Sequence, residues 1–349
     1  MKGTLPYIEL LMEMLAIPAI SREEELRSDF LETYIQRLGW PVSRIQHNLL
    51  VGEPGSPGAA VLMNSHMDTV PPVAGWESDP FSPLVEGDKI IGLGSNDAGA
   101  SVVTMLASFH QMKHKLGERM NLMLLLSAEE EVSGINGITL VLPRLGELKA
   151  VIVGEPTGMA PAVAERGLMV LDGEVRGIAG HAARNEGKNA IYEAMNDIGA
   201  IRMLEFREES EWLPEPGAQV TMISAGTSHN VVPGLCSYVV DVRSNDRYGN
   251  ERLLEMIRSV CRGSLNPRSM RLRSSILDND HPLMNAIRKT GLEPIGSSTL
   301  SDMALIPFPA VKMGPGDSSR SHTAGEYILK KELEQGVADY CRFLENIEV

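Results

Sequence analysis

The sequence has few cysteines, and they are not arranged to form a metal site or a disulfide framework. Cys236, Cys261 and Cys341 are far apart in the chain, and no C-x-x-C pair occurs. A disulfide-rich fold and a thiolate metal site are therefore not expected. The sequence also lacks a G-x-S-x-G nucleophile elbow, which disfavours covalent acyl-enzyme chemistry.

Long apolar runs and basic clusters are missing too. No apolar stretch approaches the ~20 residues that span a bilayer. Residues 1–17 form an amphipathic helical pattern that Glu9 and Glu13 interrupt, unlike a signal peptide. The net charge of −14, without a basic stripe, argues against nucleic acid as a partner. We therefore expect a cytoplasmic protein that binds neither membranes nor nucleic acid.

The length predicts about two domains, because 349 residues exceed the roughly 100–200 typical of one domain. Ser21–Glu24 matches a capping box before a helix that ends near Gly39. Short apolar runs then alternate with helical patterns as far as Val153 and again after Ile276. This alternation indicates an α/β domain with a mostly parallel sheet and helices on both faces.

The pattern changes near Pro161. Strands are expected at 163–176, 219–225 and 237–243, and helices at 189–204 and 250–262. Two helices on one face of an antiparallel sheet would form a small inserted α+β domain. We predict a discontinuous catalytic domain, residues 1–162 and 276–349, and an inserted lid and dimerisation domain, residues 163–275.

A histidine and an aspartate two residues apart, His66 and Asp68, follow the apolar run that begins at Ala59. In an extended segment they share a face, so one could bind a metal while the other orients it. A polar pair with no metal would fit the same residues. Asp97, in the glycine-rich segment Gly92–Gly99, is either another ligand or the N-cap of a helix. The segment lacks G-x-G-x-x-G spacing and a Walker lysine, which disfavours a nucleotide site.

Three glutamates, Glu129–Glu131, directly follow the apolar run that ends at Leu126. Adjacent carboxylates at the end of a buried strand repel one another unless a cation joins them. Glu155 follows the next apolar run, and His322 supplies a second imidazole late in the chain. Two histidines with several carboxylates suit zinc, cobalt or manganese better than magnesium.

These motifs, in this order, resemble the zinc aminoacylases and exopeptidases that include acetylornithine deacetylase, succinyl-diaminopimelate desuccinylase and carboxypeptidase G. The resemblance implies two zinc ions, for which cobalt may substitute, bridged by Asp97. His66 and Glu155 would bind one ion, and Glu131 and His322 the other.

The triple glutamate leaves the register open by one position. Aligning the Asp-Glu-Glu of the family with Glu129–Glu131 makes Glu130 the general base and Glu131 the ligand. Glu129 then stands where the family has aspartate. In such a site the cations lower the pKa of a water and polarise the scissile carbonyl, while the free carboxylate transfers the proton.

The inserted segment also matches the family. His181 resembles the histidine that stabilises the oxyanion, often from the neighbouring subunit, and Asn230 and Arg243 match substrate-binding positions. Asn230 could equally be a turn residue, and Arg243 a charge on the sheet surface. The resemblance implies a homodimer formed through the inserted domain.

The function expected from the resemblance is metal-dependent hydrolysis of an N-acyl amino acid, most of all deacetylation of N-acetylornithine in arginine biosynthesis. Desuccinylation of ornithine or diaminopimelate, or dipeptidase or carboxypeptidase activity, is the alternative. A catalytically silent metal-binding protein belongs to a different class, and a free Glu130 argues against it.

Overall fold

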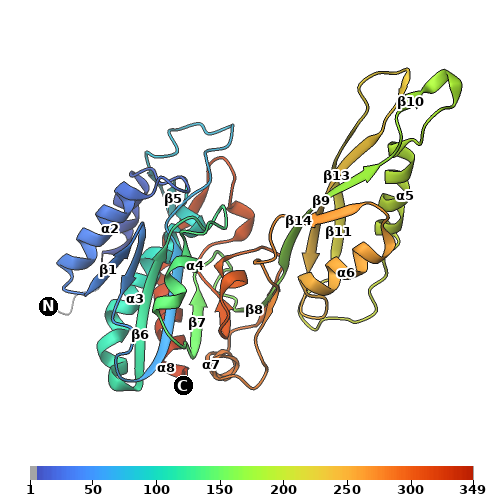
Figure 1. The fold of residues 1–349 in the computed structure, drawn as a ribbon. Coiled ribbons are helices and arrows are strands. Elements are labelled where there is room, and N and C mark those ends of the chain that lie inside the picture. Colours follow the sequence, from blue (N-terminus) through green and yellow to red (C-terminus); the bar gives the residue numbers. More distant parts are fainter. Residues whose placement is uncertain (1–5, 349) are drawn as a thin grey trace. The chain divides into compact units, whose positions relative to one another are not determined.

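A computed structural model describes residues 6–348 (Figure 1). The chain divides into two compact units, described separately below. Unit 1 contains the residues up to Val163, Leu277–Ile295 and the residues from Ser301 onward, and unit 2 contains Ala164–Ile276 and Gly296–Leu300. Among the described residues, no helix combines the length and apolar character needed to cross a bilayer.

Unit 1 is built on a sheet whose strands follow the order β1-β2-β6-β3-β7-β17-β8. The central strands are parallel: β3 pairs with both β6 and β7, and β17 pairs with β7. Antiparallel pairs flank them, β1 with β2 and β2 with β6 on one side and β17 with β8 on the other. The strands are β1 (Val42–Ile45), β2 (Asn48–Val51), β3 (Ala59–His66), β6 (Met120–Ser127), β7 (Ala150–Val153), β8 (Ala162–Glu165) and β17 (Ala310–Lys312).

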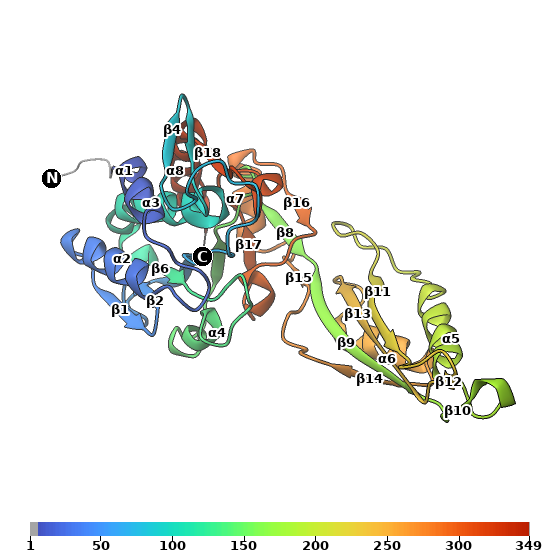
Figure 2. The ribbon, with the colours of Figure 1, turned by 90° about the horizontal axis from the view of Figure 1, so that it is seen from above.

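Helices cover both faces of this sheet (Figure 2). On one face α3 (Ala100–Leu116) packs on β3 and β6, α1 (Tyr7–Leu15) and α8 (Lys330–Asn346) pack on α3, and α7 (Pro282–Thr290) packs on α8. On the other, α4 (Ile138–Val141) buries Ile138 and Val141 against Leu62 and Met123. The predicted α/β class with a mostly parallel sheet is confirmed. The first five residues of the predicted helix 1–17 lie outside the described residues.

Two further features of unit 1 were not predicted from the sequence. The hairpin of β1 and β2 extends the sheet beside α2 (Glu25–Arg37). A small antiparallel sheet joins β4 (Leu84–Glu86), β5 (Lys89–Ile91) and β18 (Tyr327–Leu329). Through β18 the late segment that carries His322 is anchored beside the glycine-rich segment.

The predicted capping box at Ser21–Glu24 is wrong. Helix α2 begins at Glu25, its N-cap is Glu24, and no side chain caps it. The Ser21 hydroxyl instead donates to Asp68 Oδ2 at 2.6 Å. A buried tertiary carboxylate has taken the place of the local backbone partner, because a hydrogen bond to a charged group is stronger than a bond to a neutral one.

Unit 2 has an antiparallel sheet with strand order β11-β13-β9-β14 and two helices, α5 and α6, packed on it. Tyr238 on the sheet and Ile257 on α6 lie in its core. The elements are β9 (Gly167–Arg176), α5 (Ala190–Arg202), β11 (Gly217–Ala225), β13 (Leu235–Ser244), α6 (Asn250–Val260) and β14 (Ser264–Pro267). The predicted α+β architecture is confirmed.

Several short strands complete unit 2. The strand predicted over 163–176 is two strands, β8 and β9, which break at Arg166. Strand β15 (Ser275–Ile276) pairs with the end of β8. Strands β10 (Gly180–His181) and β12 (Val231–Val232) form a separate pair, and β16 (Ile295–Ser297) lies where the chain changes units.

Candidate metal centre

The parallel strands deliver acidic and imidazole side chains to one edge of the sheet. His66 is the last residue of β3 and is in register with Ser127, the last residue of β6. Glu130 follows three residues after β6, and Glu155 two residues after β7. Because the carboxyl ends of parallel strands meet at one edge, these residues come together although they are far apart in sequence.

Asp97 reaches this edge from a loop that the carboxylate of Glu326 holds. The Glu326 oxygens accept the backbone N–H groups of Gly94, Asn96 and Asp97 at 2.9–3.0 Å. Gly94 has a φ of +77°, and a Cβ there would lie 2.6 Å from the Thr69 side chain, so the loop requires glycine. The alternative that Asp97 caps a helix is wrong, because α3 begins at Ala100 with Gly99 as its N-cap.

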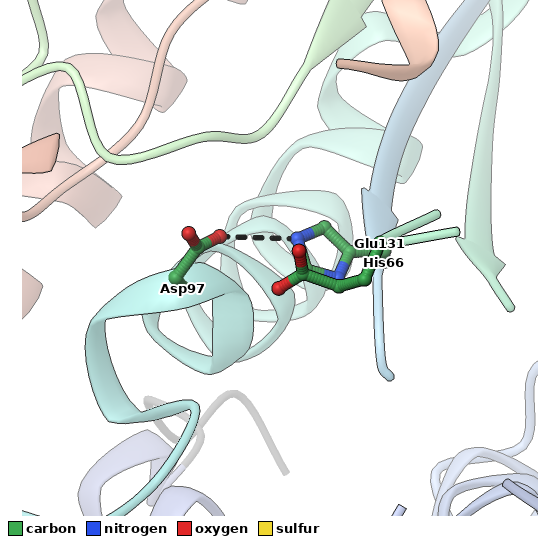
Figure 3. A group of neighbouring side chains, drawn as sticks. All are labelled: His66, Asp97 and Glu131. Carbon is green, nitrogen blue, oxygen red and sulfur yellow. Dashed lines mark hydrogen bonds and ion pairs between the residues drawn. The ribbon is translucent and has the colours of Figure 1, made fainter. Parts of the chain in front are cut away.

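His66 faces three carboxylates. Its Nε2 lies 3.1 Å from Asp97 Oδ1, 3.7 Å from Glu155 Oε1 and 3.9 Å from Glu130 Oε2. Figure 3 shows the contact between His66 and Asp97, with Glu131 beside them. Glu155 Oε1 is buried and, in the part of the chain described, has no hydrogen-bond partner. A buried carboxylate oxygen directed at an imidazole in this way is suited to bind a cation.

The second imidazole comes from the late segment of the chain. His322 Nε2 lies 3.0 Å from Glu131 Oε2 and 3.7 Å from Asp97 Oδ2. The two oxygens of Asp97 therefore face different histidines, Oδ1 toward His66 and Oδ2 toward His322. All five residues expected as ligands come together at this edge.

The grouped side chains fit a metal ion. In two sets, His66–Asp97–Glu131 and His66–Glu130–Glu155, one ligand atom per residue lies within 4.8 Å of the others. Carboxyl and imidazole atoms are the ligands that zinc and related divalent ions take. Both Glu130 and Glu131 belong to such a set, so proximity alone does not distinguish the base from the ligand.

The crowding of charges shifts the pKa values of this site. Burial, together with the charges of Glu155 and Asp302, raises the pKa of Glu130 well above its usual range. Burial alone would lower the pKa of His66, but the carboxylates around it, led by Glu130, raise that pKa well above its usual value. The carboxylates have lost hydration and repel one another, and a bound cation would relieve both effects.

Asp68 contacts both His66 and the loop that carries the glutamates. The Nδ1 atom of His66 lies 3.0 Å from the Asp68 carbonyl oxygen and 3.5 Å from its carboxylate Oδ1. The carboxylate also accepts the backbone N–H groups of Glu130 and Glu131, at 3.1 and 3.2 Å. Asp68 therefore orients the His66 ring and also holds the loop that carries Glu130 and Glu131.

Two buried carboxylates near the site, Asp302 and Glu326, were not among the predicted site residues. Asp302 accepts hydrogen bonds from Asn64 Nδ2 and the Ser127 hydroxyl, and burial raises its pKa to about 6. Burial likewise raises the pKa of Glu326, which holds the Asp97 loop, to about 7. The contacts of both residues are with partners more than 170 positions away in sequence, which local sequence patterns do not reveal.

The residues predicted in unit 2 fall in two places. His181 pairs with Val231 between β10 and β12, and the Asn230 carbonyl accepts the N–H of Ala182 at 3.0 Å, so His181 and Asn230 are neighbours. Arg243 lies near the opposite end of β13, where it pairs with Asp241 at 2.7 Å. His181 is exposed, and its Nδ1 accepts the N–H of Ala183.

The fold and the grouped ligands define a metallohydrolase with a catalytic α/β unit and a second α+β unit. The family model described as "Peptidase family M20/M25/M40" matches residues 62–346. The chain belongs to this family.

Comparisons with individual proteins support this family membership. An acetylornithine deacetylase from Myxococcus xanthus is 25% identical over 98% of this chain and 99% of its own length. A succinyl-diaminopimelate desuccinylase from Sphingopyxis alaskensis is 26% identical over 72% of each chain. The solved structure of a Bacillus subtilis protein, described as a dinuclear metal binding peptidase from the M20 family, aligns with a TM-score of 0.72, 14% identity and 98% coverage of both chains.

The register of the glutamates predicts different behaviour for Glu130 and Glu131. Glu130→Ala should still bind two metal ions per chain and lose about 10²–10⁴-fold in kcat, because it removes only a proton-transfer group. Glu131→Ala should bind one ion fewer, because it removes a ligand. Metal content by elemental analysis, with kinetics on the same samples, checks both. If only the Glu130 variant loses metal, Glu130 is the ligand and Glu131 is the general base.

Proposed function

We propose that the chain hydrolyses the amide bond of an N-acyl amino acid and that N-acetylornithine is its substrate. The observation that carries the proposal is the position of Asp97, whose two carboxylate oxygens face two different imidazoles. One carboxylate between two histidines suits a pair of divalent ions. The full-length match to an acetylornithine deacetylase supports the choice of acyl group.

Two divalent ions are assigned to the site, with zinc favoured by the mixed imidazole and carboxylate ligands. His66 and Glu155 would hold one ion, Glu131 and His322 the other, and Asp97 both. When bound, the ions supply Lewis-acid polarisation of the amide carbonyl and a lower pKa for a nearby water.

Glu130 is assigned as the general base. It takes the proton from the attacking water and gives it to the leaving amine. Two contacts support this role: its backbone N–H is bound to Asp68, and its Oε2 lies 3.9 Å from His66 Nε2.

A homodimer through unit 2 is the proposed assembly. Strand β11 is at the edge of its sheet, and Met222 and Ile223 on it are 64% and 55% exposed. Tyr192 and Met195 on the neighbouring α5 are 67% and 60% exposed. A free edge strand beside exposed apolar side chains is suited to pair with a second copy.

His181 is assigned to the oxyanion of the partner's site, and Asn230 and Arg243 to substrate binding. The chain passes into unit 2 at Ala164 and runs along β9 before it reaches His181. Ten residues of β9 span about 30 Å of extended strand. His181 and Asn230 therefore lie at the end of unit 2 opposite the one at which the chain enters β9.

Desuccinylation is the second candidate, because a succinyl-diaminopimelate desuccinylase aligns with most of the chain at similar identity. A succinyl group carries a carboxylate that an acetyl group lacks, so the acyl groups of the two substrates differ by one negative charge. A silent metal-binding protein is disfavoured, because it would gain nothing from a glutamate such as Glu130 in addition to the five ligands.

Metal removal should abolish hydrolysis. The five proposed ligands come from five separate segments, and without the ions the site loses the Lewis acids that would polarise the carbonyl and lower the pKa of the water. Dialysis against a chelator should remove activity, and zinc or cobalt should restore it. Full activity in protein shown by elemental analysis to be metal-free would contradict the mechanism.

The acyl group can be tested directly. N-acetyl-L-ornithine, N-succinyl-L,L-diaminopimelate and a dipeptide are compared by kcat/KM. We expect N-acetyl-L-ornithine to be preferred by at least about tenfold, which corresponds to roughly 1.4 kcal/mol of transition-state binding. A preference for the succinyl substrate would transfer the assignment to desuccinylation, and two bound ions without any turnover would indicate a silent protein.

Sharing of His181 predicts recovery of activity on mixing two inactive variants. His181→Ala and Glu130→Ala subunits are dissociated, mixed and reassociated. If His181 acts in trans, each mixed dimer has one intact site and one site that lacks both residues. Random pairing makes half the dimers mixed, so about a quarter of the wild-type activity per site is expected. Mixed dimers that form but stay inactive would show that His181 does not act in trans.

A further inference from the structure

The segment Ser21–Arg27 resembles a helix start in sequence, but its side chains also bind residues far away in the chain, near the candidate metal centre. Ile20 pairs in parallel with Thr69, whose N–H donates to the Ala19 carbonyl at 2.9 Å. This pairing places Ser21 against Asp68, to which its hydroxyl donates at 2.6 Å. The segment therefore runs alongside the residues that follow the predicted ligand His66.

Glu24 in this segment holds the loop of the three glutamates. Its Oε1 accepts the N–H of Glu129 at 3.0 Å, and Asp68 accepts the next two N–H groups, those of Glu130 and Glu131. Three successive backbone donors thus point at two buried carboxylates. Glu129 has a φ of +54°, which costs free energy in a residue other than glycine, so these bonds hold the loop in a conformation that it would not adopt alone.

Arg27 supplies a positive charge that interacts electrostatically with the Asp68 and Glu24 carboxylates. It is 1% exposed, its Nη1 donates to the Met67 carbonyl at 2.7 Å, and its Nε and Nη2 donate to the Ile17 carbonyl. Burial lowers its pKa to about 10, against the opposing effects of Asp68 and Glu24, so it stays charged at neutral pH. One guanidinium therefore fixes the backbone between His66 and Asp68 and balances the charge.

We propose that Ser21, Glu24 and Arg27 form an N-terminal clamp of positioning residues that sets the place of the Glu130 and Glu131 carboxylates. The clamp rests on the proposed function, in which these two side chains are the base and a metal ligand. Ser21 acts through Asp68, Glu24 through the N–H of Glu129, and Arg27 through the backbone at Met67.

The burial of Glu24 is hard to explain by stability of the fold alone. Its side chain is fully buried, and its Oε2 has no hydrogen-bond partner among the described residues. A buried carboxylate costs free energy unless it is paired, and an apolar residue of similar size often stabilises a fold as well or better. The structure compensates this burial with two N–H groups that Oε1 accepts, from Arg22 and Glu129, and with the charge of Arg27.

The test compares Glu24→Gln with Glu23→Gln. Both remove one negative charge at the start of α2 and keep the side-chain shape, but Glu23 is exposed and Glu24 is buried. Each variant is assayed for amide hydrogen exchange of a peptide covering residues 128–134, for metal content, and for kcat and KM. Ser21→Ala and Ser21→Thr are assayed in parallel, because threonine keeps the hydroxyl that donates to Asp68.

For Glu24→Gln we expect faster exchange confined to residues 128–134 and a kcat reduced about tenfold. The glutamine amide oxygen can still accept the Glu129 N–H, but a hydrogen bond to a neutral acceptor is weaker than one to a carboxylate. KM should change less than about twofold, because Glu24 does not reach the substrate. Glu23→Gln should match the wild type in all assays. Ser21→Ala should show faster exchange and a lower kcat, as Glu24→Gln does, but to a smaller extent. Ser21→Thr should remain close to the wild type.

Unchanged exchange in residues 128–134 of the Glu24→Gln protein would overturn the clamp. Faster exchange throughout unit 1 with a lowered Tm would also overturn it, because Glu24 would then serve the fold in general. If the wild-type chain hydrolyses none of the substrates tested, the proposed function fails, and the exchange comparison alone decides whether the clamp exists.

Discussion

Repulsion between buried carboxylates is the physical constraint on which the rest of unit 1 depends. Asp97, Glu130, Glu131 and Glu155 come together around two imidazoles at the edge of a parallel sheet. Acidic groups that have lost hydration at such short distances repel one another, and they stay together only if cations compensate them and the backbone holds them in place. The raised pKa values of Glu130 and Glu155 reflect this conflict.

Backbone N–H groups bound to carboxylates hold the two loops of the site. Glu326 accepts three N–H groups from the loop that carries Asp97. Asp68 and Glu24 together accept three from the loop that carries Glu130. Each loop is irregular, and its polar backbone groups would otherwise be unpaired in a buried place. The same bonds therefore satisfy the backbone and orient the side chains that are proposed to carry the chemistry.

Unit 2 is organised differently, around one apolar core between its sheet and two helices. It brings His181 and Asn230 together at one end and places Arg243 at the other end of β13. Its edge strand β11 carries exposed apolar side chains. These features suit a unit that binds a second copy and contributes polar groups to its site, as proposed above.

The sequence by itself determined the α/β class, the α+β architecture of the inserted segment and the strand ends at which polar side chains gather, whereas the ligand set is what the family resemblance implies. It could do so because apolar periodicity reports which residues are buried, and because His66, Glu130 and Glu155 each follow a buried run whose end lies at one edge of the sheet.

Only the tertiary structure decided which oxygen faces which imidazole and what each loop is bound to. Ser21 reads locally as a helix cap, yet its partner is Asp68, 47 positions away. Glu24 and Glu326 find their partners 105 and about 230 positions away. Local sequence can only suggest local partners for a polar side chain. Once the chain is folded, a buried carboxylate binds the strongest hydrogen-bond donor within reach, because an unpaired buried charge costs free energy. The distance of that donor along the sequence does not matter.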